Sequence, residues 1–373
     1  MLQKNPFLIR SSWAALFFAL VLVSGCAKTP QILKYEVDPQ AAMIWPQPPE
    51  TPRYRFVGVL TGEQNFVNDS IQRTFSQKMG DFFRWVVGLG SQGREPRVLQ
   101  RPQTGAVDAE GRVLVTDISR HEVMVFDRSK GELDEWEMAT AEKEFNTPVA
   151  IAVGDNGTVY VTDSELALVT QLDHKGNPIK QFGHDVLKRP TGIARDPQNK
   201  QIYVADTHDH NIKVFSDNGE LVDIIGKWGQ GIGEFNSPTH LAFAQGKLYV
   251  TDTFNTRVQI LDRSGDFSHQ IGQRGLYVGN LIRPKGVTTD SDGNIYVIES
   301  YADYLLVYNS KGEFLLPIGG TGAEIGQFYL PSGVWSDEDD RIYVADMFNG
   351  RIVVLQYLSD RYKNKTVPTV STK

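Results

Sequence analysis

The chain has 373 residues, of which 40% are hydrophobic and 22% charged, and its formal net charge at pH 7 is −7. This composition is ordinary for a globular protein with a large core. The acidic balance argues against nucleic acid as a partner, because nucleic acid is bound by a basic face. It argues equally against broad electrostatic attachment to anionic lipid headgroups.

Residues 1–26 have the order of parts found in an export signal. Lys4 and Arg10 form a basic start, Trp13–Val23 is an uninterrupted apolar run, and a Ser-Gly pair leads to Cys26, the only cysteine. This ending resembles the lipobox of bacterial lipoproteins, whereas the alternative is an ordinary signal peptide with a chance cysteine. We expect Cys26 to be lipidated, which leaves no thiol for a disulfide. Cleavage before Cys26 removes Lys4 and Arg10, so the formal net charge of the mature chain becomes −7 − 2 = −9.

The segments that flank the main part of the chain have different compositions. Ala27, rather than Asp, follows the cysteine, which resembles lipoproteins sent to the outer membrane. We therefore expect an exported protein held at the membrane by its lipid anchor, on the periplasmic or the surface side. The proline-rich stretch WPQPPETPR makes residues 27–53 a stiff tether, and the polar residues 359–373 are expected to be a flexible tail.

Six similar segments recur between these flanks. They are GRVLVTD (111–117), GTVYVTD (157–163), KQIYVAD (200–206), GKLYVTD (246–252), GNIYVIE (293–299) and DRIYVAD (340–346), and they close on Asp117, Asp163, Asp206, Asp252, Glu299 and Asp346. A proline and a short apolar run precede each segment, and one or two further apolar runs follow it. Each repeat therefore predicts four short antiparallel strands, and repeats of this length stack radially into a propeller. We expect an all-β fold with six four-stranded blades.

The ring needs one more strand to close. The sixth repeat has no fourth apolar run, whereas RYRFVGVLTGEQNF at 53–66 matches the fourth strand and exit of other repeats, such as DIIGKWGQGIGEF at 223–235. We therefore predict that Arg55–Leu60 forms the outer strand of the last blade, so that both ends of the domain share one blade. This arrangement removes the open edge that an incomplete blade would expose.

The repeats resemble those of the NHL family. Residues 206–212 read DTHDHNI, 252–258 read DTFNTRV and 346–352 read DMFNGRI. The family pattern has an Asp at the end of the second strand, an Asn in the turn, and an Arg at the start of the third strand, here Arg257 and Arg351. The resemblance covers residues 54–358, and it is weaker in the fifth repeat, where Glu299 replaces Asp. Together with the lipobox and the proline-rich stretch, the repeats make the chain resemble a bacterial NHL-repeat propeller lipoprotein, and NHL propellers serve many functions on one scaffold.

The turn after Asp206 contains His208, Asp209 and His210, which are all possible metal ligands. The same positions in other repeats hold Phe-Asn-Thr and Phe-Asn-Gly. Asp and Asn favour such turns, and a metal site needs three or four convergent ligands. We therefore interpret the stretch as a polar turn, with a metal site as the alternative.

Some propellers of this kind are enzymes with polar residues around the central pore. The residues that enter the first strands are Thr104, Val149, Thr191, Thr239, Lys285 and Ser332, with His240 as the only imidazole. His240 and Lys285 do not make a divalent-metal site. They are candidates for binding an anion or for general-base catalysis in a propeller hydrolase or lyase. We expect no metal and no cofactor.

Residues 67–98 form an insertion that other repeats lack. Its apolar residues Ile71, Phe75, Met79, Phe82, Phe83 and Val86 recur with helical spacing. We predict an amphipathic helix of about four turns. Its apolar face is expected to pack on the ring, and contact with membrane or a partner is the alternative.

Topology predicts one functional face. In a four-stranded blade, the turn between the second and third strands lies on the same side as the link to the next blade. This face should carry His208, Asp209, His210, Trp228, Phe254, Tyr277, Tyr301 and Phe348. Aromatic loops on a rigid scaffold are typical of binding surfaces. We expect a monomeric scaffold that binds an envelope protein, peptide or polymer there. Substitutions of Asp155, Gln198 or Asp292 on the opposite turns should be nearly silent.

Overall fold

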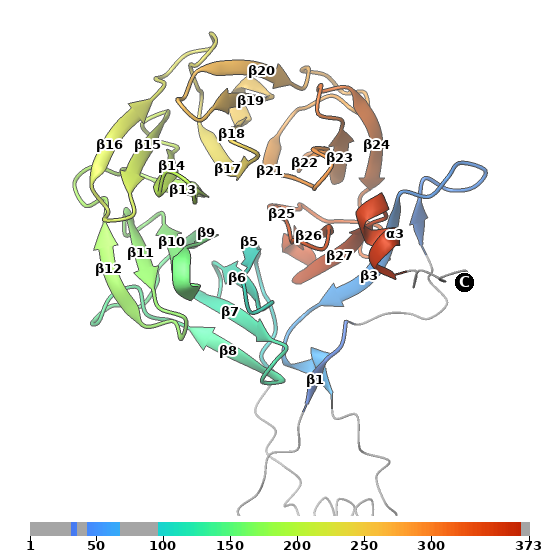
Figure 1. The fold of residues 1–373 in the computed structure, drawn as a ribbon, viewed down its shortest axis with the longest axis horizontal. Helices are drawn as coiled ribbons and strands as arrows, with labels where there is room; N and C mark the ends of the chain where they lie inside the picture. The colour runs from blue at the N-terminus through green and yellow to red at the C-terminus, as the bar shows by residue number, and fades with distance from the viewer. Residues whose placement is uncertain (1–30, 36–42, 68–95, 367–373) are drawn as a thin grey trace, which may run out of the picture.

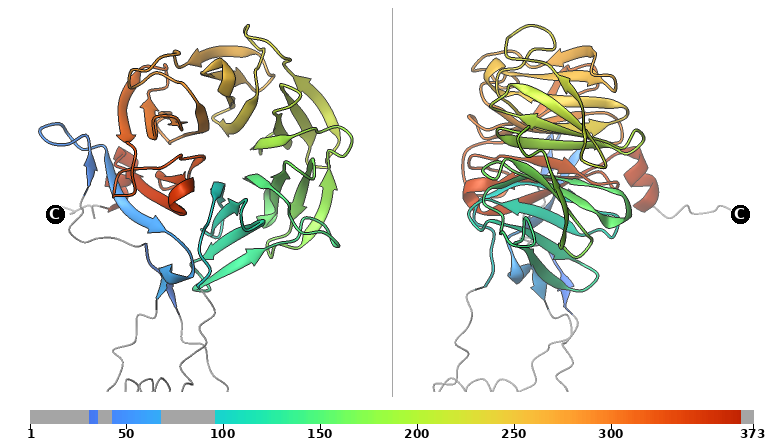
Figure 2. Two further views of the ribbon diagram at one scale, coloured as in Figure 1. Left: turned by 180° about the vertical axis from the view of Figure 1, so that it is seen from behind. Right: turned by 90° about the vertical axis from the view of Figure 1, so that its left-hand side faces the viewer.

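The computed structural model describes residues 31–35, 43–67 and 96–366. Six sheets surround a central axis, and the first strand of each repeat lies next to that axis (Figure 1). Seen from the side, the ring is a thick disc (Figure 2). The predicted six-bladed propeller of four-stranded antiparallel blades is confirmed.

Each blade runs from the axis outward in chain order, except in the last blade. Blade 1 contains β5 (Pro102–Val107), β6 (Val113–Asp117), β7 (Glu122–Asp127) and β8 (Glu132–Trp136); blade 2 contains β9 (Pro148–Val153), β10 (Val159–Asp163), β11 (Leu168–Leu172) and β12 (Pro178–Phe182); blade 3 contains β13 (Pro190–Asp196), β14 (Gln201–Asp206), β15 (Asn211–Ser216) and β16 (Leu221–Ile225). Blade 4 contains β17 (Pro238–Ala244), β18 (Lys247–Asp252), β19 (Arg257–Asp262) and β20 (Phe267–Ile271); blade 5 contains β21 (Pro284–Thr289), β22 (Ile295–Glu299), β23 (Tyr304–Tyr308) and β24 (Phe314–Gly319). Single 3-10 turns occur at η1 (Glu63–Asn65), η2 (Asp155–Gly157), η3 (Thr253–Asn255) and η4 (Met347–Asn349).

Blade 6 joins the two ends of the domain. Strands β25 (Val334–Ser336), β26 (Arg341–Asp346) and β27 (Arg351–Tyr357) come from the C-terminal side, and β3 (Tyr54–Leu60) pairs antiparallel with β27. The closing strand predicted at Arg55–Leu60 is therefore confirmed. A short fifth strand, β2 (Ile44–Trp45), covers the outer edge of β3. Nearby, β1 (Ile32–Leu33) pairs with β4 (Phe66–Val67).

The core consists of six apolar clusters, and each one fills the seam between neighbouring blades. The middle strands are buried on both faces, so they read as continuous apolar runs rather than as alternating patterns. β6, for example, has the sequence VLVTD and is buried at every position. Because these faces are buried between blades, each repeat depends on its neighbours for its core.

The closing acid of each repeat ties down the link that leads into its own blade. Each closing acid accepts at least one backbone N–H from the link that precedes the inner strand of its blade. Examples are Gln100 N to Asp117 Oδ2 at 2.7 Å and Ile282 N to Glu299 Oε2 at 2.7 Å, and the same holds for Asp163, Asp206, Asp252 and Asp346. The link therefore has a fixed position even though it lies outside the sheet. Glu299 makes the same contact with its longer side chain.

Hydroxyl groups join neighbouring blades near the axis. Thr162 Oγ1 donates to the carbonyl of Thr191 at 2.6 Å, Thr207 Oγ1 donates to that of Pro238 at 2.7 Å, and Thr253 Oγ1 donates to that of Pro284 at 3.0 Å. Each bond satisfies a carbonyl of the next inner strand that the sheet leaves free.

The remaining segments differ in how far the structure describes them. The predicted helix of the 67–98 insertion lies at residues outside the described part of the chain. Helix α3 (Asp360–Thr366) occurs in the segment where the sequence predicted a flexible tail, and it begins after Ser359 Oγ donates to Asp340 Oδ2 at 2.7 Å. Among the described helices, none has the length and hydropathy of a membrane span.

Candidate functional site: the link face and the central channel

The turns between second and third strands meet the links between blades. The backbone N–H of Phe254 donates to Asn236 O at 3.1 Å, and that of Phe348 donates to Tyr329 O at 3.1 Å. Asn255 Nδ2 donates to Gly229 O at 2.9 Å. Links and turns therefore form one continuous surface, which we call the link face. The opposite surface, with the turns between first and second strands, is the turn face.

Buried arginines fix the links of blades 4 and 6. Arg257 Nε lies 2.8 Å from Asp252 Oδ2, and its Nη2 donates to the carbonyl of Glu234 at 2.9 Å. Arg351 pairs with Asp346 at 2.7 Å. Burial raises the pKa of the Asp252 and Asp346 carboxyls, and the hydrogen bonds and arginines oppose that shift. The Asp and Arg of the repeat motif therefore have a structural role: they hold the loops from which other side chains project.

Large apolar side chains are exposed along the links and turns of blades 4 to 6. Leu276 and Tyr277 are 83% and 85% exposed, and Trp228 is 69% exposed. Together they form the link-face patch: Trp228, Ile232, Phe254, Leu276, Tyr277, Val278, Tyr301, Tyr329 and Phe348. Tyr329 and Phe348 pack edge to face, with ring centroids 5.5 Å apart. Five of the aromatic members were predicted from the sequence. Ile232, Leu276, Val278 and Tyr329 were not predicted, although they lie on the same links.

The turn containing His208, Asp209 and His210 makes contacts that hold the loop in place. His210 has a positive φ of 54°, and its Nδ1 accepts the backbone N–H of Ser237 at 2.9 Å. Asp209 pairs with Lys213 at 2.6 Å and also with Lys188. The two lysines lower the pKa of the Asp209 carboxyl against the opposing effect of burial. The carboxylates of Asp206 and Asp209 are therefore already paired with lysines. The turn with His208, Asp209 and His210 is a polar part of the link face.

His240 lies on β17 and lines the central cavity. The positive charge of Lys285 on β21 acts on its imidazole. His240 is 8% exposed, and burial together with the Lys285 charge lowers its pKa to about 3. Its Nδ1 lies 3.1 Å from Thr239 Oγ1, whereas its Nε2 has no hydrogen-bond partner among the described residues. Burial also lowers the pKa of Lys285. The structure thus places His240 on the wall of the central cavity, whereas Lys285 is not among the residues that line it.

Comparison with known proteins agrees with this geometry. Residues 187–215 match the model of the NHL repeat, and residues 266–298 match that of a beta-propeller repeat. The chain is a six-bladed β-propeller whose third blade matches the NHL repeat. The matches fall on blade 3 and across the junction of blades 4 and 5.

One curated relative of this propeller is Protein brain tumor from Drosophila melanogaster, 28% identical over 129 residues. The alignment covers 34% of this chain and 12% of that protein, so the similarity concerns a small part of the relative.

Solved structures share the fold at low identity. A protein of unknown function from Bacteroides thetaiotaomicron has a TM-score of 0.58 at 15% identity, with 70% of each chain covered. Virginiamycin B lyase from Staphylococcus aureus has a TM-score of 0.52 at 17% identity, covering 69% of this chain and 96% of the lyase. A chain from a nidogen/laminin complex has a TM-score of 0.50 at 19% identity, covering 67% and 89%. These likenesses establish the propeller fold alone.

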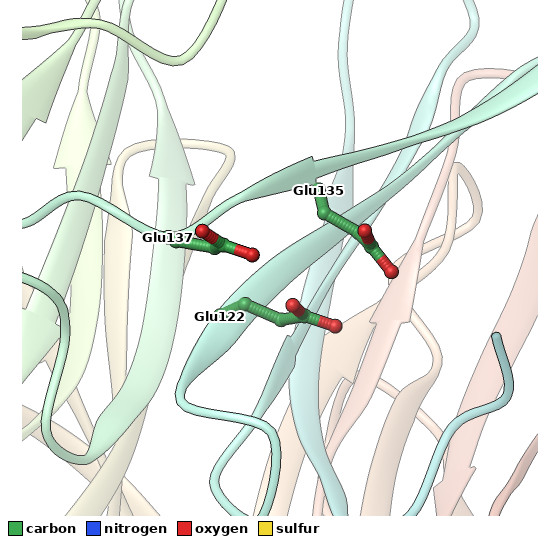
Figure 3. Close-up of side chains that lie close together, drawn as sticks. All are labelled: Glu122, Glu135 and Glu137. Atoms are coloured by element: carbon green, nitrogen blue, oxygen red, sulfur yellow. The ribbon is translucent and has the colours of Figure 1, made fainter.

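A cluster of three acids on blade 1 of the propeller was not predicted from the sequence. Glu122, Glu135 and Glu137 lie close together (Figure 3), with one carboxylate oxygen of each within 4.8 Å of the others. Arg97 Nη1 lies 2.7 Å from Glu135 Oε2, and Arg120 pairs with both Glu122 and Glu135. Two guanidinium groups therefore balance most of the charge that would attract a cation, and the cluster is best described as an ion-pair network.

Proposed function

We propose that this chain is a lipid-anchored scaffold of the bacterial envelope that binds a protein or peptide through the link-face patch. The observation that carries the proposal is the exposure of nine large apolar side chains on links and turns whose backbone is held by buried carboxylates, two of them paired with arginines. Exposed aromatic residues on a rigid support contribute strongly to binding, because little conformational entropy is lost when they are covered. A chain of similar fold from a nidogen/laminin complex supports a protein partner.

The partner class follows from the chemistry of the patch. Its nine members are aromatic or aliphatic, and the nearby Asp209 is already paired with lysines. A surface of this kind fits a partner that presents apolar side chains. It fits a highly charged polymer less well, because such a polymer needs unpaired charges of the opposite sign.

Site-specific photo-crosslinking in the intact envelope tests the location of the partner. A photoreactive phenylalanine analogue at Tyr277 should give one dominant adduct, and Trp228→Ala in the same chain should reduce its yield. The matched control carries the analogue at Gln198, an exposed residue on the turn face. Adducts of equal yield at both positions, or a Tyr277 adduct that ignores Trp228→Ala, would contradict binding at the patch.

The lipid anchor has a separate test. Cys26→Ser should block lipidation and move the protein from the membrane fraction to the soluble fraction of the envelope. Retention in the membrane fraction, with unchanged processing of the N-terminus, would refute the anchor while leaving the binding surface standing.

A second candidate function is a hydrolase or lyase that uses His240 and Lys285. One observation favours it, namely the buried imidazole nitrogen that has no partner among the described residues. A solved neighbour of similar fold is a virginiamycin B lyase variant described as catalytically inactive, in which a histidine is replaced by alanine. The two functions separate on one comparison: His240→Ala should abolish an enzymatic role, whereas crosslinking from Tyr277 should be unchanged if the protein is a scaffold.

A further inference from the structure

The outer strand of each blade has an edge that faces away from the ring (Figure 1). Proteins protect such edges with proline, with charged residues or with a covering segment, because an open edge pairs with other strands. Five of the six edges here have such protection or a polar sequence: β3 is covered by β2, β8 (ELDEW) is acidic and its Leu133 carbonyl accepts Arg97 Nη2, β12 (PIKQF) contains Pro178 and Lys180, β20 reads FSHQI, and β24 contains Pro317.

Strand β16 in blade 3 is the exception. It reads LVDII, so it contains neither proline nor lysine, and its only polar residue is Asp223. Leu221, Val222 and Ile224 are 41%, 52% and 48% exposed, although residues of these types are usually buried. A short, apolar and uncovered edge of this kind is available to pair with another strand.

The register of β16 assigns its side chains to two faces. Asp223 and Ile225 pair with residues of β15 that pack toward blade 4, and they line a groove of about 430 Å³ between these two blades. Leu221 and Ile224 belong to the other face, which is turned toward blade 2. A strand added at this edge would therefore meet apolar side chains on one face and a carboxylate on the other.

The groove has one charge without an opposite partner. Of the two charged residues that line it, Arg263 is paired with Asp196 at 2.6 Å, whereas Asp223 forms no ion pair within the described part of the chain. The Asp223 carboxylate accepts the backbone N–H of Ile224 at 2.7 Å, and this bond is exposed to solvent. A strand that approaches the edge can replace the bond, while a cation on that strand pairs with the carboxylate.

Blade 6 shows how such an edge is filled in this molecule. There β2 pairs antiparallel with the outer strand β3. The backbone N–H of Phe56 donates to Met43 O at 2.9 Å, and that of Arg53 donates to Trp45 O at 2.7 Å. Met43 and Trp45 also pack against the apolar cluster beside that blade. An extended segment is therefore held at a blade edge by backbone hydrogen bonds and apolar side chains together.

A second copy of the chain fits the edge of β16 less well than a different protein does. Asp223 is the middle residue of the five in β16. Symmetric antiparallel pairing of two β16 strands would place the two Asp223 side chains opposite each other. Like charges at directly opposite positions of a sheet are destabilising, so the edge favours a segment with the opposite charge.

We propose that the edge of β16 binds an extended segment of a partner protein, which adds to blade 3 as a fifth strand. The segment carries Lys or Arg opposite Asp223 and aliphatic residues on either side of it. In this mode of recognition, main-chain hydrogen bonds supply affinity, and the side chains supply specificity. The site lies on the rim of the ring, apart from the link-face patch, and does not depend on the proposed function.

A synthetic heptapeptide tests strand addition directly. The probe has a central Lys with two Val and one Thr on each side, blocked ends, and N-methyl groups at alternate residues, which leave one backbone edge open and prevent self-association. Fluorescence anisotropy with the full-length protein in detergent should show saturable binding. The same peptide methylated at every residue, which closes both edges, should bind at least about tenfold more weakly. Absence of binding by the first peptide, or equal affinity of the two, would overturn the proposal.

A lysine substitution locates the site on the protein. Ile224→Lys should weaken binding of the probe about tenfold, because a lysine protects the edge and repels the central Lys. Ile179→Lys is the matched control: Ile179 is 55% exposed on β12, whose edge is already protected, and its replacement should leave the affinity unchanged. Both variants should keep the melting temperature of the parent, since both side chains are exposed. Equal affinities of the two variants would place the peptide elsewhere and overturn the proposal.

A charge exchange tests the role of Asp223. A probe with Glu in place of its central Lys should bind the parent protein weakly, and Asp223→Lys should reverse the preference between the two probes. An unchanged preference would show that Asp223 does not select the segment. Sedimentation of the full-length protein tests the other occupant: a dimer that Ile224→Lys dissociates would assign the edge to a second copy and overturn the proposal.

Discussion

The two faces of the ring are built from the same strands but differ in what their connections expose. On the turn face, short Asp- or Asn-containing turns bind their own backbone: Asp262 Oδ1 accepts the N–H groups of Ser264 and Asp266 at 2.9 and 3.0 Å, and Asn309 Oδ1 accepts those of Lys311 and Glu313. On the link face, the polar groups are buried beneath the loops, and apolar side chains project from them.

The unfavourable exposure of apolar side chains is therefore concentrated on the link face. A turn whose polar groups bond to its own backbone has few free groups with which to bind a partner. A loop whose carbonyls are held by a buried arginine, as Arg257 holds those of Gly231 and Glu234, is rigid enough to display Trp228 to solvent. The link that carries Tyr277 is held instead by Glu299, which accepts the backbone N–H of Ile282. Exposed apolar groups of this size are a cost for an isolated soluble domain, so their concentration on one face indicates a binding surface.

The largest effect should come from removing the strand on which both faces depend. Deletion of residues 54–60 strips blade 6 of its outer strand and exposes the edge of β27. We expect the whole ring to lose cooperative unfolding, because each blade is stabilised mainly by its neighbours. Scanning calorimetry measures this, and deletion of residues 360–373 is the control that should leave the main transition in place. A cooperative transition at the parent temperature after the first deletion would disprove closure by β3.

Loop anchoring on the two faces should differ strongly in its effect on stability. Asp252→Ala leaves the buried Arg257 without its carboxylate and frees the link that Asp252 holds through Asn236, so we expect a loss of about 3–5 kcal/mol in unfolding free energy. Asp262→Ala removes a solvent-exposed turn contact and should cost clearly less. Urea denaturation of both variants gives the comparison, and equal losses would show that the links are not held by their buried ion pairs.

The stability of the protein should depend on pH through His240, near the link-face end of β17. Its pKa is about 3 in the folded state and about 6.5 when unfolded. Between these values the unfolded chain takes up a proton that the folded protein does not, so stability is complete above pH 6.5 and falls as the pH is lowered. At pH 4.5 the loss should be about 3 kcal/mol relative to pH 8.

The matched variant for this measurement is His240→Gln, which does not titrate. The difference in unfolding free energy between parent and variant should change by the stated amount between pH 8 and pH 4.5, since the other acids contribute equally to both. Parallel pH profiles would mean that His240 is not buried in its neutral form.

The smallest predicted effect concerns affinity rather than folding. Trp228→Ala and Tyr277→Ala should each weaken binding of the partner by about 2 kcal/mol, and neither should change the melting temperature appreciably. Gln198→Ala on the turn face is the control and should change neither quantity. A loss of affinity in Gln198→Ala alone would place the partner on the turn face and contradict binding at the link-face patch.

Much of the fold could be predicted because the repeats can be aligned with one another. Six aligned segments with the same closing acid give the number of blades, and the unmatched stretch before the first repeat identifies the closing strand. The link face followed from topology. The short strand β2 was not predicted, because two residues carry too little periodicity to signal a strand.

The candidate site was harder to predict from the sequence, because its contacts join residues that are far apart in the chain. Asp155 and Asp292 were expected to be replaceable turn residues, yet Asp155 Oδ1 accepts a hydrogen bond from Arg195 at 2.9 Å, 40 positions away, and Asp292 Oδ2 accepts one from Tyr357 at 2.7 Å, 65 positions away. Of the three proposed silent positions, only Gln198 has no such cross-link. Likewise, the surroundings of His240 are formed by a cavity that the inner strands of all six blades line, so they depend on residues far away in the chain.

The pairing of β3 with β27 also sets the timing of assembly. Leu60 and Ile352 are hydrogen-bonded neighbours about 290 positions apart in the chain. The closing strand β3 therefore lacks its main partner until β27 has been synthesised, and before then only the two-residue strand β2 can pair with it. During that interval one edge of β3 is unpaired, and unpaired strand edges favour aggregation. Folding of this protein should consequently depend on a chaperone that shields β3 until the ring can close.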